Sequence, residues 1–345
     1  MLRIFLTEFK KLVKINRLPL VVLLAITVRA VLYFLPQVHE HPYSDEVYKR
    51  YTTQLEGELT SDKIKNLNTR LAEIDELIAI YDEMQQSYAS GELTLDEYSA
   101  YTEQHGKAKA EEITVRYLCR KCEILDGCTD FEGQIFYDTA WCNFFEDNSF
   151  DYVMLIALSC IAIPAFDAEF SSGSFAQILT SKRGKAQLAL SKLVAVWVTV
   201  FVLSCLMSAA RLGVYAFQNG LNYSDMPVGN ILLTDGFGST TLIEYYLKDS
   251  LIKALIWAMY SCLFSLIAVL CKNVTFAFVA GFILGITPQI ISAGVKSERV
   301  VYFISGMQLG KMYSASVSLW LLVGIIFIKS ILLSLAVSMA WSKKA

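Results

Sequence analysis

The chain has 345 residues, of which 54% are hydrophobic and only 18% are charged, and its mean hydropathy is +0.44. An ordinary globular domain carries about 25% charged residues. Here the apolar residues fall into runs of about 18–25, the length that crosses a hydrocarbon core of about 30 Å. These properties exclude a soluble enzyme, a nucleic-acid-binding domain and a disordered chain.

Charge is unevenly distributed along the chain. Between Gln37 and Phe150 there are 24 acidic and 10 basic residues, whereas the remainder holds 9 acidic and 20 basic residues. The overall net charge of −3 is therefore the sum of a strongly acidic segment and a basic, apolar remainder. This division predicts a water-exposed insert within a membrane protein.

Residues 1–17 predict an amphipathic helix that lies in the membrane interface. Leu2, Phe5 and Phe9 recur at helical spacing, with Arg3 and Lys10 among the basic residues between them. The first transmembrane helix is expected at 18–36. A secretory signal peptide is the alternative, but the apolar run is too long and no A-x-A cleavage site follows it.

The acidic insert, residues 37–149, has a helical pattern of its own. Apolar residues step by threes and fours from Ile64 to Tyr88, and Gly91 then interrupts the pattern. Thr94 and Glu97 form a capping-box sequence that starts a second helix. We expect an extracellular helical hairpin, which serves either as a docking arm for a partner or substrate, or as a spacer that packs only on itself.

Four cysteines follow the predicted hairpin: Cys119, Cys122, Cys128 and Cys142. An even number of cysteines in an oxidising compartment favours two disulfides. Free thiols are the alternative. A zinc site would need a second C-x-x-C pair or a nearby histidine, and the sequence has neither, so no metal is expected.

Residues 150–345 contain five further apolar runs, and the fold class expected is all-α with six transmembrane helices. The runs are Phe150–Phe166, Leu188–Val214, Tyr246–Leu270, Val274–Ala293 and Ser316–Trp341. Six spans place both termini on the same side. Lys and Arg concentrate at the termini and in the short connections on that side, which predicts that it is cytoplasmic and that the insert is outside.

Ionisable residues within membrane spans are costly and are functional candidates for that reason. The candidates are Arg29, Arg211, Lys253 and Lys329. The first three lie toward the outer ends of their spans, where long side chains can reach the interface. Lys329 lies near the middle of the last span, so we expect it to face a cavity or an acid such as Glu244 or Asp249.

The sequence offers no catalytic motif. It has no G-x-x-x-x-G-K-[ST] phosphate loop and no H-E-x-x-H motif. None of its three histidines falls in a predicted span. We therefore expect neither a cofactor nor an enzymatic activity in this chain.

The connection between the second and third spans, residues 167–192, carries the most informative pattern. Acidic residues stand at its start and basic residues at its end, and a short helix with an apolar face is expected near Phe175–Thr180. Such a helix suits insertion into a groove on another protein, and an ordinary interfacial loop is the alternative. The residues expected to act are Glu169, Gly173, Phe175, Ile178, Leu179, Arg183 and Lys192.

This loop resembles the signature of ABC-2-type transporter permeases. In that family an E-x-x-x-G element leads to a short coupling helix, and an Arg and then a Lys follow; Glu169, Gly173, Arg183 and Lys192 stand at the matching places. The resemblance covers residues 1–36 and 150–345, and not the insert. The family often has a proline before the arginine, where this chain has Lys182.

The resemblance implies the permease subunit of an ABC exporter in a bacterial plasma membrane, with both termini cytoplasmic. Its partners would be a separate ATP-binding subunit, a second permease subunit and membrane lipid, and not nucleic acid. The substrate would be a peptide, a lipid or a drug-like molecule, and Ser297–Tyr313 would be a re-entrant element. A multi-pass sensor or receptor whose hairpin binds a ligand is the alternative function.

Overall fold

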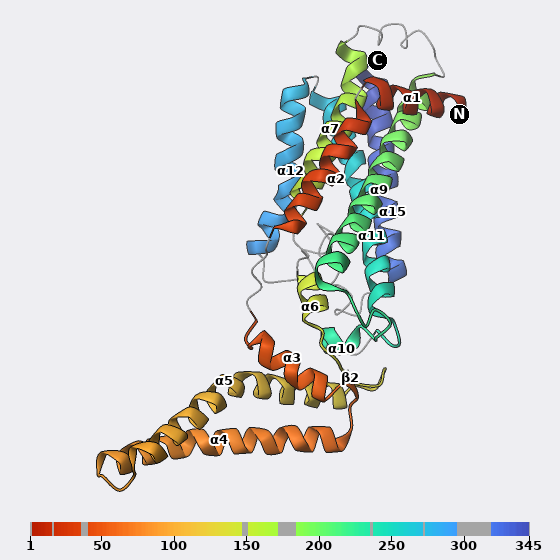
Figure 1. The fold of residues 1–345 in the computed structure, drawn as a ribbon. Helices are drawn as coiled ribbons and strands as arrows, with labels where there is room; N and C mark the ends of the chain where they lie inside the picture. The colour runs from red at the N-terminus through yellow and green to blue at the C-terminus, as the bar shows by residue number, and fades with distance from the viewer. Residues whose placement is uncertain are drawn as a thin grey trace. The chain divides into compact units, whose positions relative to one another are not determined.

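The computed structural model describes residues 2–15, 17–35, 41–146, 151–171, 184–234, 237–271, 273–294 and 319–344. Twelve helices and two short strands occupy these residues, so the protein is all-α, as the sequence predicts (Figure 1). The chain divides into two compact units. We call them the apolar unit (1–37, 147–220 and 246–345) and the acidic unit (38–146 and 221–245).

The apolar unit is a bundle of long helices. They are α1 (Leu2–Ile15), α2 (Leu18–Phe34), α7 (Tyr152–Ser171), α9 (Gly184–Asn219), α11 (Leu242–Cys271), α12 (Val274–Gly294) and α15 (Leu319–Lys344). The helix α9 contacts α1, α2, α7 and α15, and α7 also contacts α2 and α12. Leu158, Val196, Ile256 and Phe264 are among the fully buried residues at the centre.

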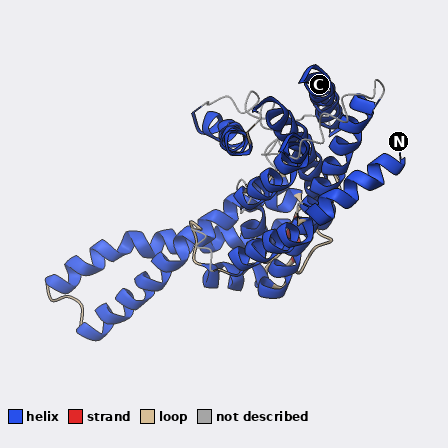
Figure 2. Ribbon diagram, turned by 90° about the horizontal axis from the view of Figure 1, so that it is seen from above, coloured by secondary structure: helices blue, strands red, loops and turns tan. Residues whose placement is uncertain are grey.

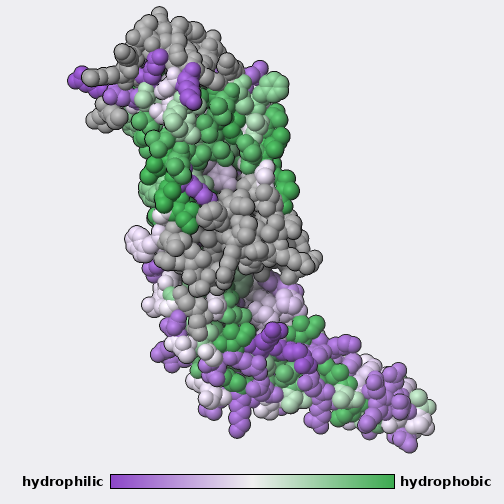
Figure 3. Space-filling view, turned by 180° about the vertical axis from the view of Figure 1, so that it is seen from behind, coloured by the Kyte–Doolittle hydropathy of each residue, from purple (hydrophilic) through white to green (hydrophobic). Residues whose placement is uncertain are grey.

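The outside of the apolar unit also carries many large apolar side chains. Figure 3 shows a broad apolar surface over these helices. Leu23, Val202, Phe276 and Leu332 are among the large apolar side chains exposed on α2, α9, α12 and α15. A helix that is apolar all round belongs in a protein core or a membrane, and exposed apolar residues on several helices favour the membrane.

Three described helices are long and apolar enough to cross a membrane: 185–219, 242–271 and 323–343. A fourth crossing is counted if α1 and α2 are taken as one bent span. The second and fifth predicted spans correspond to the shorter apolar helices 152–167 and 274–287. A full crossing takes about 20 helical residues, so the described lengths support membrane-spanning helices and leave the number six as a prediction.

The break between α1 and α2 follows from the local sequence. The two helices meet at 61°. Arg17, the N-cap residue of α2, has a φ of 48° in the left-handed region, and Pro19 stands in the first turn of α2. This geometry agrees with an amphipathic helix that precedes an apolar one.

The acidic unit contains the shorter elements and the two longest polar helices. They are α3 (Asp45–Gln54), β1 (Gly57–Glu58), α4 (Ser61–Ala89), α5 (Leu95–Asp126), β2 (Gln134–Ile135), α6 (Thr139–Glu146) and α10 (Gly229–Leu232). The strands β1 and β2 pair antiparallel, with Gly57 opposite Ile135. Leu67, Ile74, Val115 and Leu118 form part of the core of this unit.

The helices α4 and α5 pack along one another and are joined at one end by a short turn (Figure 2). Gly91 has a φ of +81° in this turn, which a residue with a Cβ rarely adopts. The capping box predicted from the sequence is confirmed. The Thr94 hydroxyl accepts from the Glu97 amide at 3.4 Å, and the Glu97 carboxylate accepts from the Thr94 amide at 3.0 Å.

Residues 221–245 belong to the acidic unit, although the sequence pattern gave no sign of it. The Trp141 indole donates to the Asn222 carbonyl at 2.6 Å, and the Gln134 amide donates to the Asn230 side chain at 2.9 Å. The acidic unit is therefore assembled from two separate parts of the chain, residues 38–146 and residues 221–245.

Two glycines four residues apart allow α12 to pack closely. A Cβ built at Gly281 would lie 2.8 Å from the Phe264 ring, and one at Gly285 would lie 2.5 Å from a Leu155 methyl carbon. Small residues at this spacing let membrane helices approach one another, where van der Waals packing replaces the hydrophobic effect as the driving force.

We expect Gly285→Leu to destabilise the apolar unit by at least about 1–3 kcal/mol, because the added side chain overfills a packed contact. The measurement is thermal unfolding of the full chain in detergent. Gly324→Leu on α15 is the control, since a Cβ there meets nothing within 4 Å among the described residues. Equal unfolding temperatures for the two variants would contradict the close packing of α12.

Candidate functional site

Most of the predicted coupling loop lies outside the described residues: Gly173, Phe175, Ile178, Leu179 and Arg183. Glu169 lies in the last turn of α7, where only the backbone is described. The stretch expected to be a re-entrant element, Ser297–Tyr313, also lies outside the described part. Lys192 is thus the one member of the predicted loop set whose side chain is described.

Lys192 lies in the first turns of α9 and is only 4% exposed. Its ammonium group donates to the Ala165 carbonyl on α7 at 2.9 Å and lies 3.6 Å from the Glu8 carboxylate on α1. The rings of Phe166 and Trp341 lie within 6 Å of the same nitrogen, at 5.9 and 5.8 Å, which is the range of a cation–π contact. We call these five residues the loop-base cluster.

The loop-base cluster joins the two ends of the predicted loop. Ala165 and Lys192 are 27 residues apart in the sequence and are linked by one buried hydrogen bond. Glu8, itself buried, adds α1 to this junction and also accepts from Lys11 at 2.7 Å. Because a buried ammonium group needs such partners, the contacts fix the start of α9 against α7 and α1.

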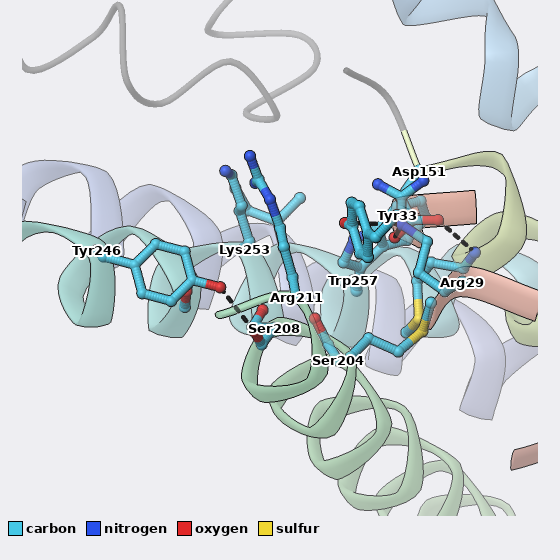
Figure 4. Close-up of a pocket in the computed structure, with 13 residues that line it drawn as sticks. Arg29, Tyr33, Asp151, Ser204, Ser208, Arg211, Tyr246, Lys253 and Trp257 are labelled. Carbon is cyan, nitrogen blue, oxygen red and sulfur yellow. Dashed lines mark hydrogen bonds and ion pairs between the residues drawn. The ribbon is translucent and has the colours of Figure 1, made fainter. Parts of the chain in front are cut away.

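A second polar cluster lies at the other end of these helices, and we call it the charged pocket (Figure 4). It is a cavity of about 70 Å³. It is lined by Arg29, Tyr33, Asp151, Met154, Ser204, Met207, Ser208, Arg211, Tyr246, Ser250, Lys253, Ile256 and Trp257. These residues come from α2, α7, α9 and α11, or immediately precede α7 in the case of Asp151.

One wall of the pocket is built around Arg29. Its guanidinium donates to the Tyr33 hydroxyl at 2.8 Å and lies 3.4 Å from the Asp151 carboxylate. Asp151 also accepts from the Met154 amide at 2.9 Å, so it caps the first turn of α7. The end of α2 and the start of α7 are joined by this ion pair.

Two more cations, Arg211 and Lys253, line the pocket. Lys253 forms an ion pair at 2.5 Å with Asp249, one turn earlier on α11. Arg211 on α9 is 8% exposed, and its guanidinium carbon lies 5.8 Å from the centre of the Tyr33 ring. Figure 4 shows the Arg211 and Lys253 side chains extending in the same direction. The Tyr246 hydroxyl donates to the Ser208 carbonyl at 2.7 Å and ties α11 to α9.

The structure thus brings together three of the four ionisable residues singled out in the predicted spans, Arg29, Arg211 and Lys253, in one pocket. The fourth, Lys329, is half-buried on α15. Asp249, one of the two acids proposed as its partner, pairs with Lys253 instead. Sequence reasoning named Asp249 only as a partner for Lys329, and it missed Asp151, because Asp151 stands at the edge of an apolar run and resembles an ordinary boundary residue.

The acidic unit has a buried charged group of its own. The Lys121 ammonium lies 2.5 Å from the Asp138 carboxylate and donates to the Tyr48 hydroxyl at 3.0 Å. Tyr48 donates to the other Asp138 oxygen at 2.7 Å. Burial lowers the pKa of Lys121, but the charge of Asp138 opposes it and the net pKa is raised, so the lysine stays protonated. Burial also raises the pKa of Tyr48, which stays neutral.

All eight cysteines lie within the described residues, and the structure joins none of them in a disulfide. The two disulfides expected among Cys119, Cys122, Cys128 and Cys142 remain a prediction. Cys119 and Cys122 lie on the buried face of α5, in the core of the acidic unit, where they pack as small apolar residues. Burial raises the pKa of the Cys122 thiol to about 11, which makes it a poor nucleophile at neutral pH.

The described residues contain no group of three or more His, Cys, Asp or Glu side chains that could hold a metal ion. His41 stacks on Tyr43 at 5.0 Å and hydrogen-bonds Asn143 at 2.6 Å. His105 stacks on Tyr81 at 3.8 Å. Both histidines therefore have structural contacts in the acidic unit.

We expect Lys121→Met to destabilise the acidic unit by about 3–5 kcal/mol, because it leaves Asp138 buried without its counter-charge. Hydrogen exchange of α5 amides in the full chain measures the loss. Lys107→Met is the matched control on the same helix. Lys107 also pairs with an acid, Glu103, but both side chains are about 70% exposed, so its loss should cost at most about 1 kcal/mol. Similar exchange in both variants would show that the buried triad does not hold this unit together.

Comparison with models of protein families, with curated proteins and with solved structures finds no match to this chain.

Proposed function

We propose that this chain is the membrane-spanning permease subunit of an ATP-driven exporter of the ABC-2 type. The observation that carries the proposal is the loop-base cluster. The resemblance gives Lys192 the last place in the coupling-loop signature, and this lysine is buried where the two ends of the loop meet. A coupling loop transmits a conformational change from the ATP-binding subunit to the membrane helices, so its ends must be fixed to those helices.

The position of α1 supports the same function. Glu8 is the only acidic residue in the basic helix of residues 1–17, and it is buried beside Lys192. The N-terminal interfacial helix and the end of the coupling loop would then move together. In this proposal ATP is hydrolysed by a separate subunit, because the chain itself has no phosphate-binding loop.

The proposed topology has six spans, cytoplasmic termini and an acidic unit outside the cell. Its test is labelling of whole cells with a membrane-impermeant maleimide, using single cysteines in a cysteine-free background. Glu92→Cys, at the exposed turn between α4 and α5, should react in intact cells. Ser181→Cys, in the predicted coupling loop, should react only after the membrane is permeabilised. Labelling of position 181 in intact cells would overturn the topology.

Coupling is tested by recovery of the ATP-binding subunit. A buried phenylalanine contributes about 1.5–3 kcal/mol through its apolar area, so Phe175→Ala should lower recovery of a Walker-motif subunit on the tagged chain about tenfold or more. Lys192→Met should retain the subunit and lose substrate-stimulated ATP hydrolysis, because it releases the loop from Glu8 and Ala165.

The matched control for Phe175→Ala is Phe276→Ala, since Phe276 is 70% exposed on the apolar surface of α12. Recovery of the ATP-binding subunit should be unchanged in this control. If Phe175→Ala and Lys192→Met both assemble and hydrolyse ATP like the parent, the loop is only a connector. If no Walker-motif subunit associates with the parent chain, the sensor or receptor function replaces the exporter.

A further inference from the structure

The outer half of the α4–α5 hairpin has no buried side chain. We call residues 75–107 the distal arm; it contains the end of α4, the turn at Gly91 and the first part of α5. The buried residues that flank it are Ile74 on α4 and Ala108 on α5, at 0% and 2% exposure. Every residue between these two is half-buried or exposed. A helix gains most of its stability by burying one face, so the distal arm is poorly explained as a spacer that packs only on itself.

Aromatic side chains line both helices of the distal arm. The Tyr81 ring stacks on His105 at 3.8 Å. The Tyr88 ring stacks on Tyr98 at 4.4 Å, and the Tyr81 and Tyr98 hydroxyl oxygens lie 3.4 Å apart. Tyr88 and Tyr101 are 37% and 38% exposed. We call these five residues the ring row. Since none of them is buried, the ring row keeps apolar surface that another helix could cover.

The distal arm is also strongly acidic. It holds eight acidic residues and one lysine, which gives a net charge of −7. Asp75 and Glu103 are the acids that form ion pairs, with Arg116 and Lys107. Five other acids are exposed and pair with no cation within the described part of the chain: Glu76, Asp82, Glu83, Glu92 and Asp96. An uncovered aromatic surface therefore lies among carboxylates that have no counter-charge.

These charges decide which partner fits the ring row. A second copy of the chain would bring the same net charge of −7 against it, and like charges brought together are unfavourable at an interface. Anionic lipids and nucleic acids are disfavoured for the same reason. A cationic partner is favoured, because the carboxylates attract it from a distance and tyrosine faces bind ammonium and guanidinium groups.

We propose that the distal arm binds a cationic amphipathic peptide, which lies along the ring row as a helix. The part of α4 in the distal arm, residues 75–89, is about 22 Å long at 1.5 Å per residue, so it matches a peptide helix of about 15 residues. The apolar face of the peptide covers the rings, and its lysines or arginines meet the acids beside them. Export of the peptide rests on the proposed function, whereas its binding does not.

The test uses the purified full chain in phosphatidylcholine nanodiscs, without an ATPase partner. The probe is a fluorescein-labelled helical peptide of leucine and lysine, with the leucines on one face. One control peptide has glutamate in place of every lysine, and another has the same composition in an order without a leucine face. Fluorescence anisotropy should show saturable binding of the probe beyond that to empty nanodiscs. The glutamate peptide should not bind, and the reordered peptide should bind more weakly.

Charge variants separate the distal arm from general attraction to the acidic unit. The double variant Asp82→Asn and Glu83→Gln keeps the shapes of the side chains. It should raise the dissociation constant of the probe about fivefold, the combined value of two exposed ion pairs. The matched control is Glu123→Gln with Asp126→Asn, which removes the same charge from exposed acids near the other end of α5. The control should leave the dissociation constant unchanged, because salt screens charges at that distance.

The ring row is tested by Tyr101→Leu, which keeps an apolar side chain and removes the aromatic face. This change should raise the dissociation constant about two- to fivefold, the value of an exposed cation–π contact. Tyr152→Leu is the matched control, at an exposed tyrosine on α7, and should bind the probe like the parent. Hydrogen exchange of amides in residues 75–107 verifies that each variant keeps its helices.

Equal binding of the glutamate peptide would overturn the proposal, as would equal affinities for the Asp82→Asn and Glu83→Gln variant and its control. Analytical ultracentrifugation distinguishes the other occupant. A dimer of the full chain that the same double variant strengthens would assign the ring row to a second copy instead. Failure to recover an ATP-binding subunit would contradict only the proposed function, because the binding test contains no such subunit.

Discussion

Charged side chains between apolar helices need opposite charges or hydrogen-bonding groups, because an unpaired ion in such surroundings is very costly. The apolar unit meets this requirement at two places, the loop-base cluster and the charged pocket. Each place joins elements that are distant in sequence: Lys192 joins α9 to α7 and α1, and Arg29 joins α2 to the start of α7. The apolar contacts between these helices are less directional. The charged contacts therefore do more to set the position of each helix along the axis of its neighbour.

The same requirement shapes the acidic unit. Lys121 lies in a core of aromatic and aliphatic side chains and is held by Asp138 and by the Tyr48 hydroxyl. The three residues belong to α5, to the segment before α6 and to α3, so one buried triad connects three elements. A buried ion pair is seldom the most stable choice in a core. Its directional contacts add to the apolar core around Tyr48 and α5 by fixing how these three elements are placed against one another.

Local features of this fold could be predicted from the sequence, and long-range ones could not. The capping box at Thr94, the break at Gly91 and the helical character of 185–219 and 242–271 follow from spacing and residue type within one segment. The addition of 221–245 to the acidic unit depends on contacts such as Trp141 with Asn222, which no local pattern encodes.

In the candidate sites, too, individual residues could be predicted from the sequence, but contacts between helices could not. Lys192 could be selected from the loop pattern, and Arg211 and Lys253 from their cost within a span. The partners Glu8 and Ala165 could not be selected, because they lie on other helices and meet Lys192 only when the helices pack. Asp249 stands four positions before Lys253 on the same helix, so this pair could have been found from its spacing. The burial of the cysteines was also not predictable from their number. Cys119 and Cys122 lie on the face of α5 that packs into the core of the acidic unit, and the sequence alone does not tell which face of α5 is buried.

The two charged clusters are connected by the backbone of α9 itself. Arg211 follows Lys192 by nineteen positions on this helix, or about 28 Å at 1.5 Å per residue. The stretch between them contains neither glycine nor proline, the residues that most often kink a helix.

In α7, by contrast, Pro164 immediately precedes Ala165, whose carbonyl accepts the hydrogen bond from Lys192. A proline within a helix weakens the helix at that point. A displacement of the loop-base cluster would therefore bend α7 near Pro164 and move α9 as a rigid body. In the proposed exporter, this movement of α9 would shift Arg211 relative to Arg29 and Asp151, far from the loop base.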